Sequence, residues 1–348
     1  MLAPYRRLTI STKLLISSLA FALPMAVLAW FMDISFVYDL DIARREMAGN
    51  QYQRSLFPLL KHVPQYRLLR LQGVGENDPE VLEHAGYVNQ ALDGAVHIDP
   101  DTEAELKLTD ASLSAMGFGH AAPSNLMELW EEVQADPEDH AAFQELMQGS
   151  RDLFHYVAEK SMLVVDPVLD SNYLAQVTVR DLPLYNELML SLLEFQRQDL
   201  SSLSEMQGVK LHDFVLLLRD SAANHIAYDA EMAVSEDPLF YGLSPTLHER
   251  FVHALTEFTA RNEDLARFME LAADQGAVQD SEVFEEKWRA AYVSGCDLFE
   301  VGSQELDELL SLRMASYSSW RRWGFILSSV ALVLAGLLVA SVARDVHR

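Results

Sequence analysis

Two uncharged apolar runs near the ends of the chain constrain its fold more than any other feature of the sequence. Leu14–Met32 forms a run of 19 residues, and Trp323–Val342 forms a run of 20. Each approaches the ~20 residues with which a helix crosses the ~30 Å hydrocarbon core of a bilayer. The sequence therefore predicts a protein with two transmembrane helices, at 14–32 and 323–342.

The first run also has the basic front of a secretory signal peptide, formed by Arg6, Arg7 and Lys13. The apolar part of a signal peptide is typically ~7–15 residues long, and no small-x-small cleavage site follows Met32 before the polar sequence begins. An uncleaved membrane anchor is the favoured interpretation, with a cleaved signal peptide as the alternative.

Charge distribution gives the expected topology. Basic flanks stay in the cytoplasm, so the tails 1–13 and 343–348 are predicted to be cytoplasmic and the segment 33–322 extracytoplasmic. Arg321 and Arg322 on the outer flank are a counter-signal. The tails contribute +3 and +1 to the net charge of −26, which leaves −30 for residues 33–322.

This acidic balance excludes two classes of partner. Binding to duplex nucleic acid needs clustered Lys and Arg to neutralise phosphates, and attachment to anionic lipid needs basic residues. Cys296 is the single cysteine, so an intrachain disulfide and a cysteine zinc cluster are excluded. Cys296 is expected to be a small buried side chain.

The extracytoplasmic segment is expected to be almost entirely helical. Apolar residues recur at steps of three and four, as in Phe143, Leu146, Met147, Leu153 and Phe154, and sustained period-2 alternation is absent from the sequence. Capping residues before Pro79, Pro137 and Pro245 mark helix starts, and glycines mark ends. The expected helices are 33–72, 79–97, 101–116, 124–135, 137–165, 170–207, 210–234, 245–275 and 281–322, the first and last continuous with the membrane helices.

Helix length suggests the architecture. Segments 33–72 and 281–322 would each be about 60 Å long if unbroken, which exceeds one storey of an ordinary bundle. Pro58 and Pro64 are expected to bend or break the first, and Pro183 to do the same within 170–207. The predicted fold class is all-α, an elongated, two-storey antiparallel helical bundle between two transmembrane helices.

The last segment carries a stripe of apolar and small residues at steps of three and four, from Phe284 through Trp288, Gly295 and Gly302 to Tyr317. Such a stripe suits packing against a long helix, and an extra step of four near Gly302 would locally unwind a supercoil. Two interpretations remain open: the core of the chain's own bundle, or the seam of a homodimer.

Motifs for catalysis are nearly absent. His248 and His253 flank a glutamate as in zinc proteases, but their spacing of five turns the second histidine ~140° away from the first. Asp99, Asp101 and Glu103 begin like a calcium loop, but Ala104 stands where glycine is needed. The chain is therefore expected to be no enzyme and to hold no metal or cofactor.

Two blocks of sequence resemble a known group of sensors. The first contains Gly49, Tyr52, Leu56, Pro58-Leu59-Leu60 and Tyr66-Arg67, and the second is Ser161-x-x-Val-Val-Asp-Pro-Val-Leu-Asp-Ser-Asn-Tyr-Leu174, followed by Leu182-Pro183. Together they look like the periplasmic all-helical sensor region of bacterial methyl-accepting chemotaxis receptors and related membrane histidine kinases and diguanylate cyclases. The resemblance covers about a tenth of the chain. It implies a ligand-binding domain on the outer side of the bacterial inner membrane.

The chain also departs from that pattern. Tyr66 replaces the family's histidine, Ala158-Glu159 stands where Gly-Asp is usual, Val168 replaces an acidic residue, and Asn172 replaces a tyrosine. Members of the group continue past the second membrane helix into an output domain, whereas this sequence ends six residues after Val342. It is expected to be either a trimmed receptor or a sensor that signals through a separate output protein.

The second block supplies candidate site residues. Asp166-Pro167 is expected to end one helix, with Asp170 or Ser171 capping the next, so turn formation alone explains these residues. The functional alternative is that the turn presents Asp166, Asp170, Asn172 and Tyr173 to a ligand. Arg67, Arg70 and Arg180 would then bind a small anion or amino acid, because guanidinium pairs with a carboxylate through two hydrogen bonds.

These observations together predict a transmembrane signal-reception module. It would bind a small extracytoplasmic ligand and transmit a helix rearrangement across the membrane, with membrane lipid around its two spans and a second copy as partner. The alternative is an accessory membrane protein whose helical bundle docks a partner protein. An exposed apolar patch would favour that alternative, and a polar cavity would favour the sensor.

Overall fold

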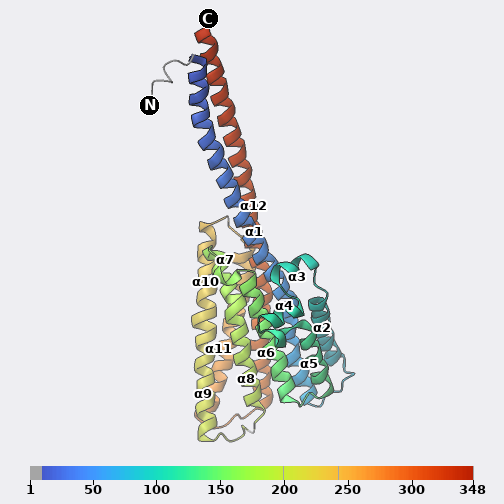
Figure 1. The fold of residues 1–348 in the computed structure, drawn as a ribbon. Helices are drawn as coiled ribbons and strands as arrows, with labels where there is room; N and C mark the ends of the chain where they lie inside the picture. Colours follow the sequence, from blue (N-terminus) through green and yellow to red (C-terminus); the bar gives the residue numbers. More distant parts are fainter. Residues whose placement is uncertain (1–9, 199, 242, 348) are drawn as a thin grey trace. The chain divides into compact units, whose positions relative to one another are not determined.

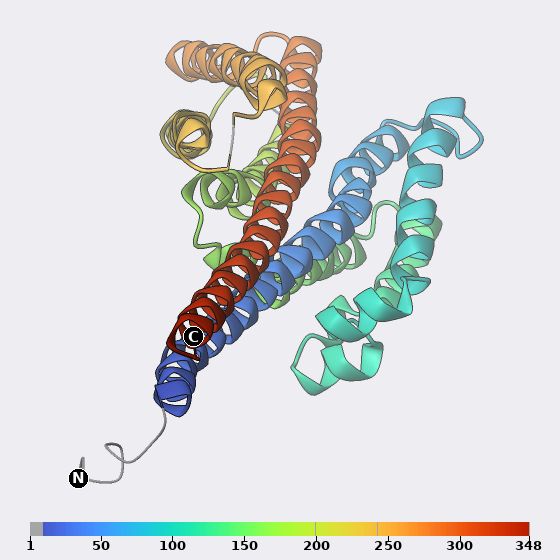
Figure 2. The same ribbon diagram turned by 90° about the horizontal axis from the view of Figure 1, so that it is seen from above.

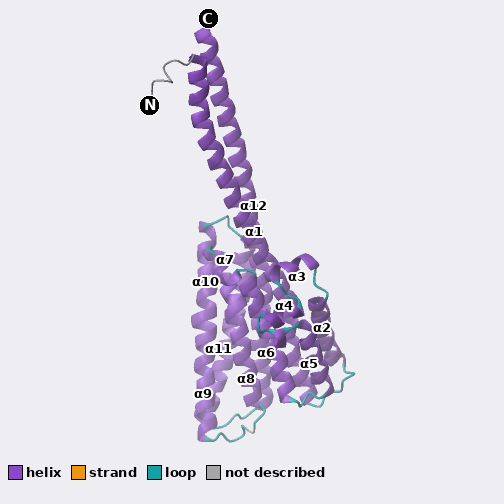
Figure 3. Cartoon of the chain, in the orientation of Figure 1, coloured by secondary structure: helices purple, strands orange, loops and turns teal. Residues whose placement is uncertain are grey.

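The computed structural model describes residues 10–198, 200–241 and 243–347. Within them every regular element is helical and no strand is present (Figure 3). This confirms the all-α fold class. The elongated, two-storey arrangement concerns overall shape and stays a prediction. Of the predicted cytoplasmic tails, residues 1–9 and Arg348 lie outside the described residues.

The α-helices follow one another along the chain with short connections. Their bounds are α1 Ile10–Leu71, α2 Pro79–Val96, α3 Pro100–Leu106, α4 Asp110–Ala115, α5 Pro123–Ala135, α6 His140–Lys160, α7 Leu169–Ala175, α8 Leu182–Gln196, α9 Glu205–Arg219, α10 Ala227–Glu236, α11 Val252–Gln275 and α12 Ser281–His347 (Figure 1). Three π-helical segments, η4 Gln176–Asp181, η5 Asp220–Ile226 and η7 Leu247–Phe251, lie between or before them.

The chain divides into two compact units. One consists of Met1–Arg44 with Ser311–Arg348, and the other is Arg45–Leu310. In the first unit α1 and α12 run beside each other: Arg321 donates to Asp33 at 2.5 Å, and a Cβ on Gly324 would overlap the side chain of Met32. Both helices contain a window that is long and apolar enough to cross a membrane and that has no buried residues.

The second unit, Arg45–Leu310, holds the core. Figures 1 and 2 show α2 and α5 on one side of α1 and α12, and α9, α10 and α11 on the other. Large side chains between the helices are almost completely buried, among them Trp130, Trp288, Tyr185, Phe154 and Phe299. The apolar periodicity in the sequence therefore marks the faces that pack inside this unit.

Capping explains where many helices begin and end. Asp78 accepts a hydrogen bond from the amide of Glu80 at the start of α2, and Ser204 and Gln207 form a capping box at the start of α9. Gly73 and Gly276, both at positive φ, follow the ends of α1 and α11. The predicted starts at Pro79 and stops at these glycines are confirmed.

Several predicted helices have different bounds. The expected helix 101–116 is two short helices, because Lys107 adopts a left-handed conformation (φ 55°) and Thr109 caps α4. Helix 137–165 is shorter, since Asp139 caps α6 and Met162 (φ 72°) follows its end. Helix 170–207 ends at Gln196, and 210–234 begins earlier, at Glu205.

The prolines act differently from the expectation. Helix α1 continues through Pro58 and Pro64, so the predicted break is wrong. Its buried neighbours, including Phe57, Leu59, Leu60 and Val63, are packed on the core and hold the helix despite two missing amide donors. At Pro183 the chain inserts the π segment η4, in which the amide of Leu182 bonds to the carbonyl of Val177.

The apolar stripe of α12 belongs to the chain's own core. Phe284, Trp288, Leu298 and Leu306 are fully buried within a single copy of the chain. These side chains are therefore not available as the seam of a homodimer, and the intramolecular interpretation of the stripe holds. A dimer through another surface stays a prediction.

Two glycines in this stripe permit close helix packing. A Cβ on Gly295 would lie 2.5 Å from Cε1 of Tyr185, and one on Gly302 would lie 3.0 Å from the methyl group of Thr178. The same face is fixed by two hydrogen bonds, from Tyr185 Oη to the carbonyl of Ala291 (2.9 Å) and from Trp288 Nε1 to that of Met189 (2.8 Å). Helices α8 and α12 are thus held at a fixed register.

We expect Gly295→Ala to lower the free energy of unfolding by about 1–3 kcal/mol, because the added methyl group overpacks the buried Tyr185 ring. Urea titration of the full chain in detergent measures the change. Gly86→Ala is the matched control: Gly86 lies in α2 with open space around its Cα, so alanine should raise helix stability by about 0.5–1 kcal/mol. Equal effects at the two positions would contradict the packing argument.

Candidate functional site

Polar side chains of the turn before α7 form hydrogen bonds with one another and with the turn's backbone. Asp166 Oδ1 accepts from the amide of Val168 (2.9 Å), and Asn172 Nδ2 donates to the carbonyl of Asp166 (2.8 Å). Asp170 accepts from the amide of Ser171 (2.6 Å), and Tyr173 packs against the core. These contacts fit the turn-forming role of Asp166, Asp170, Asn172 and Tyr173. The N-cap of α7 is Val168, so the expected cap at Asp170 or Ser171 is wrong.

Arg67, at the end of α1, has protein partners on three sides. Its Nε donates to the carbonyl of Pro137 (3.1 Å), its Nη1 pairs with Glu194, and its guanidinium lies 4.1 Å from the centre of the Phe143 ring. Its side chain is almost fully buried. The adjoining cavity has a volume of about 10 Å³, which is room for a single water. Arg67 therefore ties α1 to α6 and α8.

The remaining predicted arginines lie apart. Arg70 lies near Glu76, with its Nη1 3.9 Å from the carboxylate. Gly49 contacts Ser161, just before the Asp166 turn, whereas Arg67 is 18 residues further along α1, about 27 Å away. The structure does not bring Arg67 and Arg70 to the turn, so the expected single site of seven residues is not formed. Arg180 lies in a third place.

Arg180 lies at the edge of a polar cluster on the π segment η4. Its Nε donates to Oδ1 of Asp181 (2.8 Å), and its Nη2 donates to Oδ2 of Asp229 on α10 (3.1 Å). About half of the Arg180 side chain is exposed, but the side chains of Asp181 and Asp229 are 5% and 10% exposed. The cluster thus pairs one solvent-facing guanidinium with two buried carboxyl groups.

The Asp229 carboxyl group has a raised affinity for a proton. Burial raises the pKa of Asp229, and the neighbouring charge of Asp181 and a hydrogen bond between the two carboxyl groups raise it further; Arg180 and His225 oppose the rise. A buried pair of like charges is relieved when one member keeps a proton. Asp229 therefore holds its proton to higher pH than an ordinary aspartate, and Asp181 accepts from it.

A pocket opens beside this cluster, between the helix that contains η4 and the helix that contains η5. Its volume is about 310 Å³, at the lower end of the range for small-ligand sites. Its polar lining includes Arg180, Asp181, Asp220 and His225, and its apolar lining consists of Leu184, Leu188 and Leu217. A perturbed carboxyl group beside such a cleft is a physical indication of a functional site.

Each wall of the pocket contains a π-helical segment. In η4 the amide of Leu182 bonds five residues back to the carbonyl of Val177, directly before Pro183, which has no amide donor. In η5 the amide of Ala227 likewise bonds five residues back, to Ala222. Such turns widen a helix locally and occur frequently at functional sites. Here they place Asp181 and Asp220 on facing walls.

Sequence reasoning found Arg180 but missed Asp181, Asp229, Asp220 and His225. Asp181 stands beside Arg180 and just before Leu182-Pro183, which was the one local signal for a distorted helix. Asp229 is 48 residues further along the chain, and no spacing rule connects it to Arg180. Within the described residues no group of three His, Cys, Asp or Glu side chains is arranged to hold a metal ion.

Comparisons with known proteins identify no relative. No family model matches the chain, and neither a curated protein nor a solved structure matches it. The candidate site is therefore defined by its geometry and electrostatics.

The raised pKa of Asp229 predicts a pH-dependent stability. Unfolded aspartate loses its proton near pH 3.8 and folded Asp229 loses it at higher pH, so its contribution to stability is full below pH 3.8 and is lost as pH rises through the raised value. Asp229→Asn cannot ionise and keeps a donor toward Asp181. We expect this variant to gain stability over the wild type as pH rises from 4 to 8.

Melting temperatures of the full chain across this range measure the difference. Asp220→Asn is the control, because Asp220 lines the same pocket but its carboxylate is mostly exposed. If the melting temperatures of the wild type and Asp229→Asn change with pH in parallel, the pKa of Asp229 is not raised.

Proposed function

We propose that this chain is a transmembrane signal-reception module whose helical bundle binds a small extracytoplasmic ligand, as chemoreceptors and sensor kinases do. The observation that carries the proposal is the Arg180, Asp181 and Asp229 cluster beside a ligand-sized pocket, where two π segments face each other. The two apolar helices of the first unit support the membrane part of the proposal.

The lining of the pocket fits an amino acid with an apolar side chain. The Nη1 group of Arg180, which its bonds to Asp181 and Asp229 leave free to donate, offers a charged donor to a carboxylate, and Asp181 and Asp220 offer acceptors to an ammonium group. Leu184, Leu188 and Leu217 supply an apolar wall for the rest of the molecule. A ligand of this kind meets both charges of the site, which a simple anion does not.

The π segments supply a means of responding to the ligand. Each closes its hydrogen bonds five residues back, and closing them four residues back would rotate the helix that follows. A ligand bound between η4 and η5 would favour whichever arrangement contacts it better and would thereby shift an existing equilibrium. The rotated helices, α8 and α10, pack within the unit that also contains parts of α1 and α12.

The proposed location is the bacterial inner membrane, with residues 33–322 on the periplasmic side. The acidic character of this segment and the basic residues Arg6, Arg7 and Lys13 before the first apolar run support this orientation. A homodimer and a separate output protein are the partners that such a module would use.

A second candidate function is the docking of a partner protein. Helix α9 exposes Met206, Val209, Leu216 and Leu217, each more than half exposed, and Leu184 adds to them from α8. An exposed apolar patch of this kind favours an interaction surface. In that case the bundle would serve as an accessory scaffold and the pocket beside Leu217 would form part of the interface.

Binding of L-leucine tests the receptor proposal. We expect L-leucine to raise the melting temperature of the full chain in a non-ionic detergent, and Arg180→Gln to weaken its binding at least tenfold because the carboxylate loses its charged partner. Leu184→Trp fills the pocket from its rim and should also abolish binding. Arg267→Ala, which removes an exposed arginine of α11, is the matched control.

Circular dichroism of each variant checks that its helices are intact. If none of the common amino acids binds the wild type, or if Arg180→Gln binds L-leucine as the wild type does, the receptor proposal fails and the docking function is favoured.

Protease accessibility tests the topology. Intact spheroplasts that express the chain should lose residues 33–322 to added protease, because this segment is proposed to lie outside the cytoplasm. An epitope tag after Arg348 should stay protected until lysis. A protected central segment in intact spheroplasts would contradict an extracytoplasmic receptor.

A further inference from the structure

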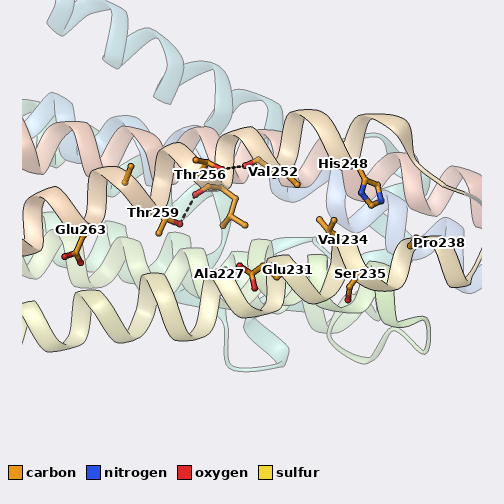
Figure 4. A pocket seen from close by; sticks show the side chains of 12 residues that line it. Ala227, Glu231, Val234, Ser235, Pro238, His248, Val252, Thr256, Thr259 and Glu263 are labelled. Atoms are coloured by element: carbon orange, nitrogen blue, oxygen red, sulfur yellow. Dashed lines mark hydrogen bonds between the residues drawn. The ribbon is translucent and has the colours of Figure 1, made fainter.

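A second, larger cleft lies on α10 and α11, and none of its lining residues lines the pocket beside Arg180. Its volume is about 780 Å³, within the range of sites for small organic ligands. Two contacts frame it. At one end Arg219 binds Glu263 and Glu270 of α11, and at the other end His248 lies 3.1 Å from Asp237. Between these contacts α10 and α11 leave a cleft, whose lining Figure 4 shows from both helices.

The walls of the cleft are largely apolar. Ala227, Val234 and Pro238 come from α10 and the turn that follows it, and Val252, Leu255 and Ala260 come from α11. These side chains would bury the carbon skeleton of a ligand. Specificity then depends on the few polar groups between them.

Every hydroxyl group in the lining has already donated its proton. Thr256 donates to the carbonyl of Val252 and Thr259 to that of Leu255, both at 2.8 Å (Figure 4). Ser235 donates to the carbonyl of Met232 at 3.0 Å. Each hydroxyl has one proton, so these three oxygens face the cleft only as acceptors.

The ionisable side chains of the lining also offer mainly hydrogen-bond acceptors. Among the described residues, no lysine or arginine lines the cleft, whereas the two carboxylates Glu231 and Glu263 do. Glu263 is bound by Arg219 and Arg267, whereas Glu231 is exposed and has no ion pair among the described residues. His248 directs Nε2 toward Asp237, so this nitrogen is already bound within the protein.

We propose that the cleft between α10 and α11 is a binding site for a small organic ammonium ion with an apolar body. Such a ligand supplies the N–H donors and the positive charge that the lining lacks, and its hydrocarbon part matches the walls. A carboxylate ligand would meet acceptors and negative charge only. A neutral alcohol would fill the same volume but would gain no charge-assisted hydrogen bond with Glu231.

Calorimetry with three ligands of similar size tests this site on the full chain in a non-ionic detergent. The probes are 2-phenylethylammonium, the neutral 2-phenylethanol and the anion 3-phenylpropanoate. We expect saturable binding of the ammonium ion, at least tenfold weaker binding of the alcohol and no binding of the anion.

Variants place the binding in the cleft. Glu231→Gln should weaken binding of 2-phenylethylammonium about fivefold, whereas Glu236→Gln, the same change on the same helix outside the lining, should not. Ala260→Trp should abolish binding, because a large side chain at this exposed position fills the cleft without entering the core. Leu184→Trp, which blocks the pocket beside Arg180, should leave it unchanged.

Three results would overturn the proposal: no saturable binding of the ammonium ion, equal or tighter binding of the alcohol or the anion, or unchanged binding in Ala260→Trp. The receptor proposal does not depend on these outcomes, since its ligand and its blocking variant concern the other pocket.

Discussion

The packing of α1 against α12 is the interaction on which the larger unit depends. The rings of Phe57 and Phe299 stack with centres 3.7 Å apart, and Lys61 pairs with Glu300 at 2.7 Å. Asn50 donates to the carbonyl of Ser303 and to Asp307, at 2.7 and 2.8 Å. These contacts join residues more than 230 positions apart, so the common core of the larger unit includes both the first and the last helix. The same two helices contain the apolar segments that are long enough to cross a membrane.

Much of the fold could be predicted from local chemistry. Apolar periodicity, the caps before Pro79 and the glycines after α1 and α11 act over one or two helical turns, and they are readable in a single sequence. The breaks that were missed depend on non-local packing. Lys107 adopts a left-handed conformation without being glycine, and α1 continues through Pro58 and Pro64, beside which Phe57 and Val63 are buried in the core. The π segments were missed because nothing in the spacing of their residues distinguishes a turn closed five residues back from one closed four residues back.

The site was only partly predictable, for a related reason. Arginine in a sequence indicates a guanidinium group but not its partners. Arg67 is enclosed by Pro137, Glu194 and Phe143, whereas Arg180 faces a pocket, and the difference arises from contacts across 49 to 127 positions of the chain. The turn from Asp166 to Tyr173 shows the opposite case. Its polar residues attract attention in the sequence, and the hydrogen bonds among them account for their presence.

The π segments have a consequence for how such a chain can diversify. Each π segment contains one residue more than an α-helix would use to span the same distance. The flanking helices keep their buried faces in register on both sides of the segment. Gain or loss of a single codon within 220–226 would therefore alter the lining of the pocket while leaving the rest of the bundle in place. The lining of the pocket could thus change through one inserted or deleted residue while the packed helices around it are kept.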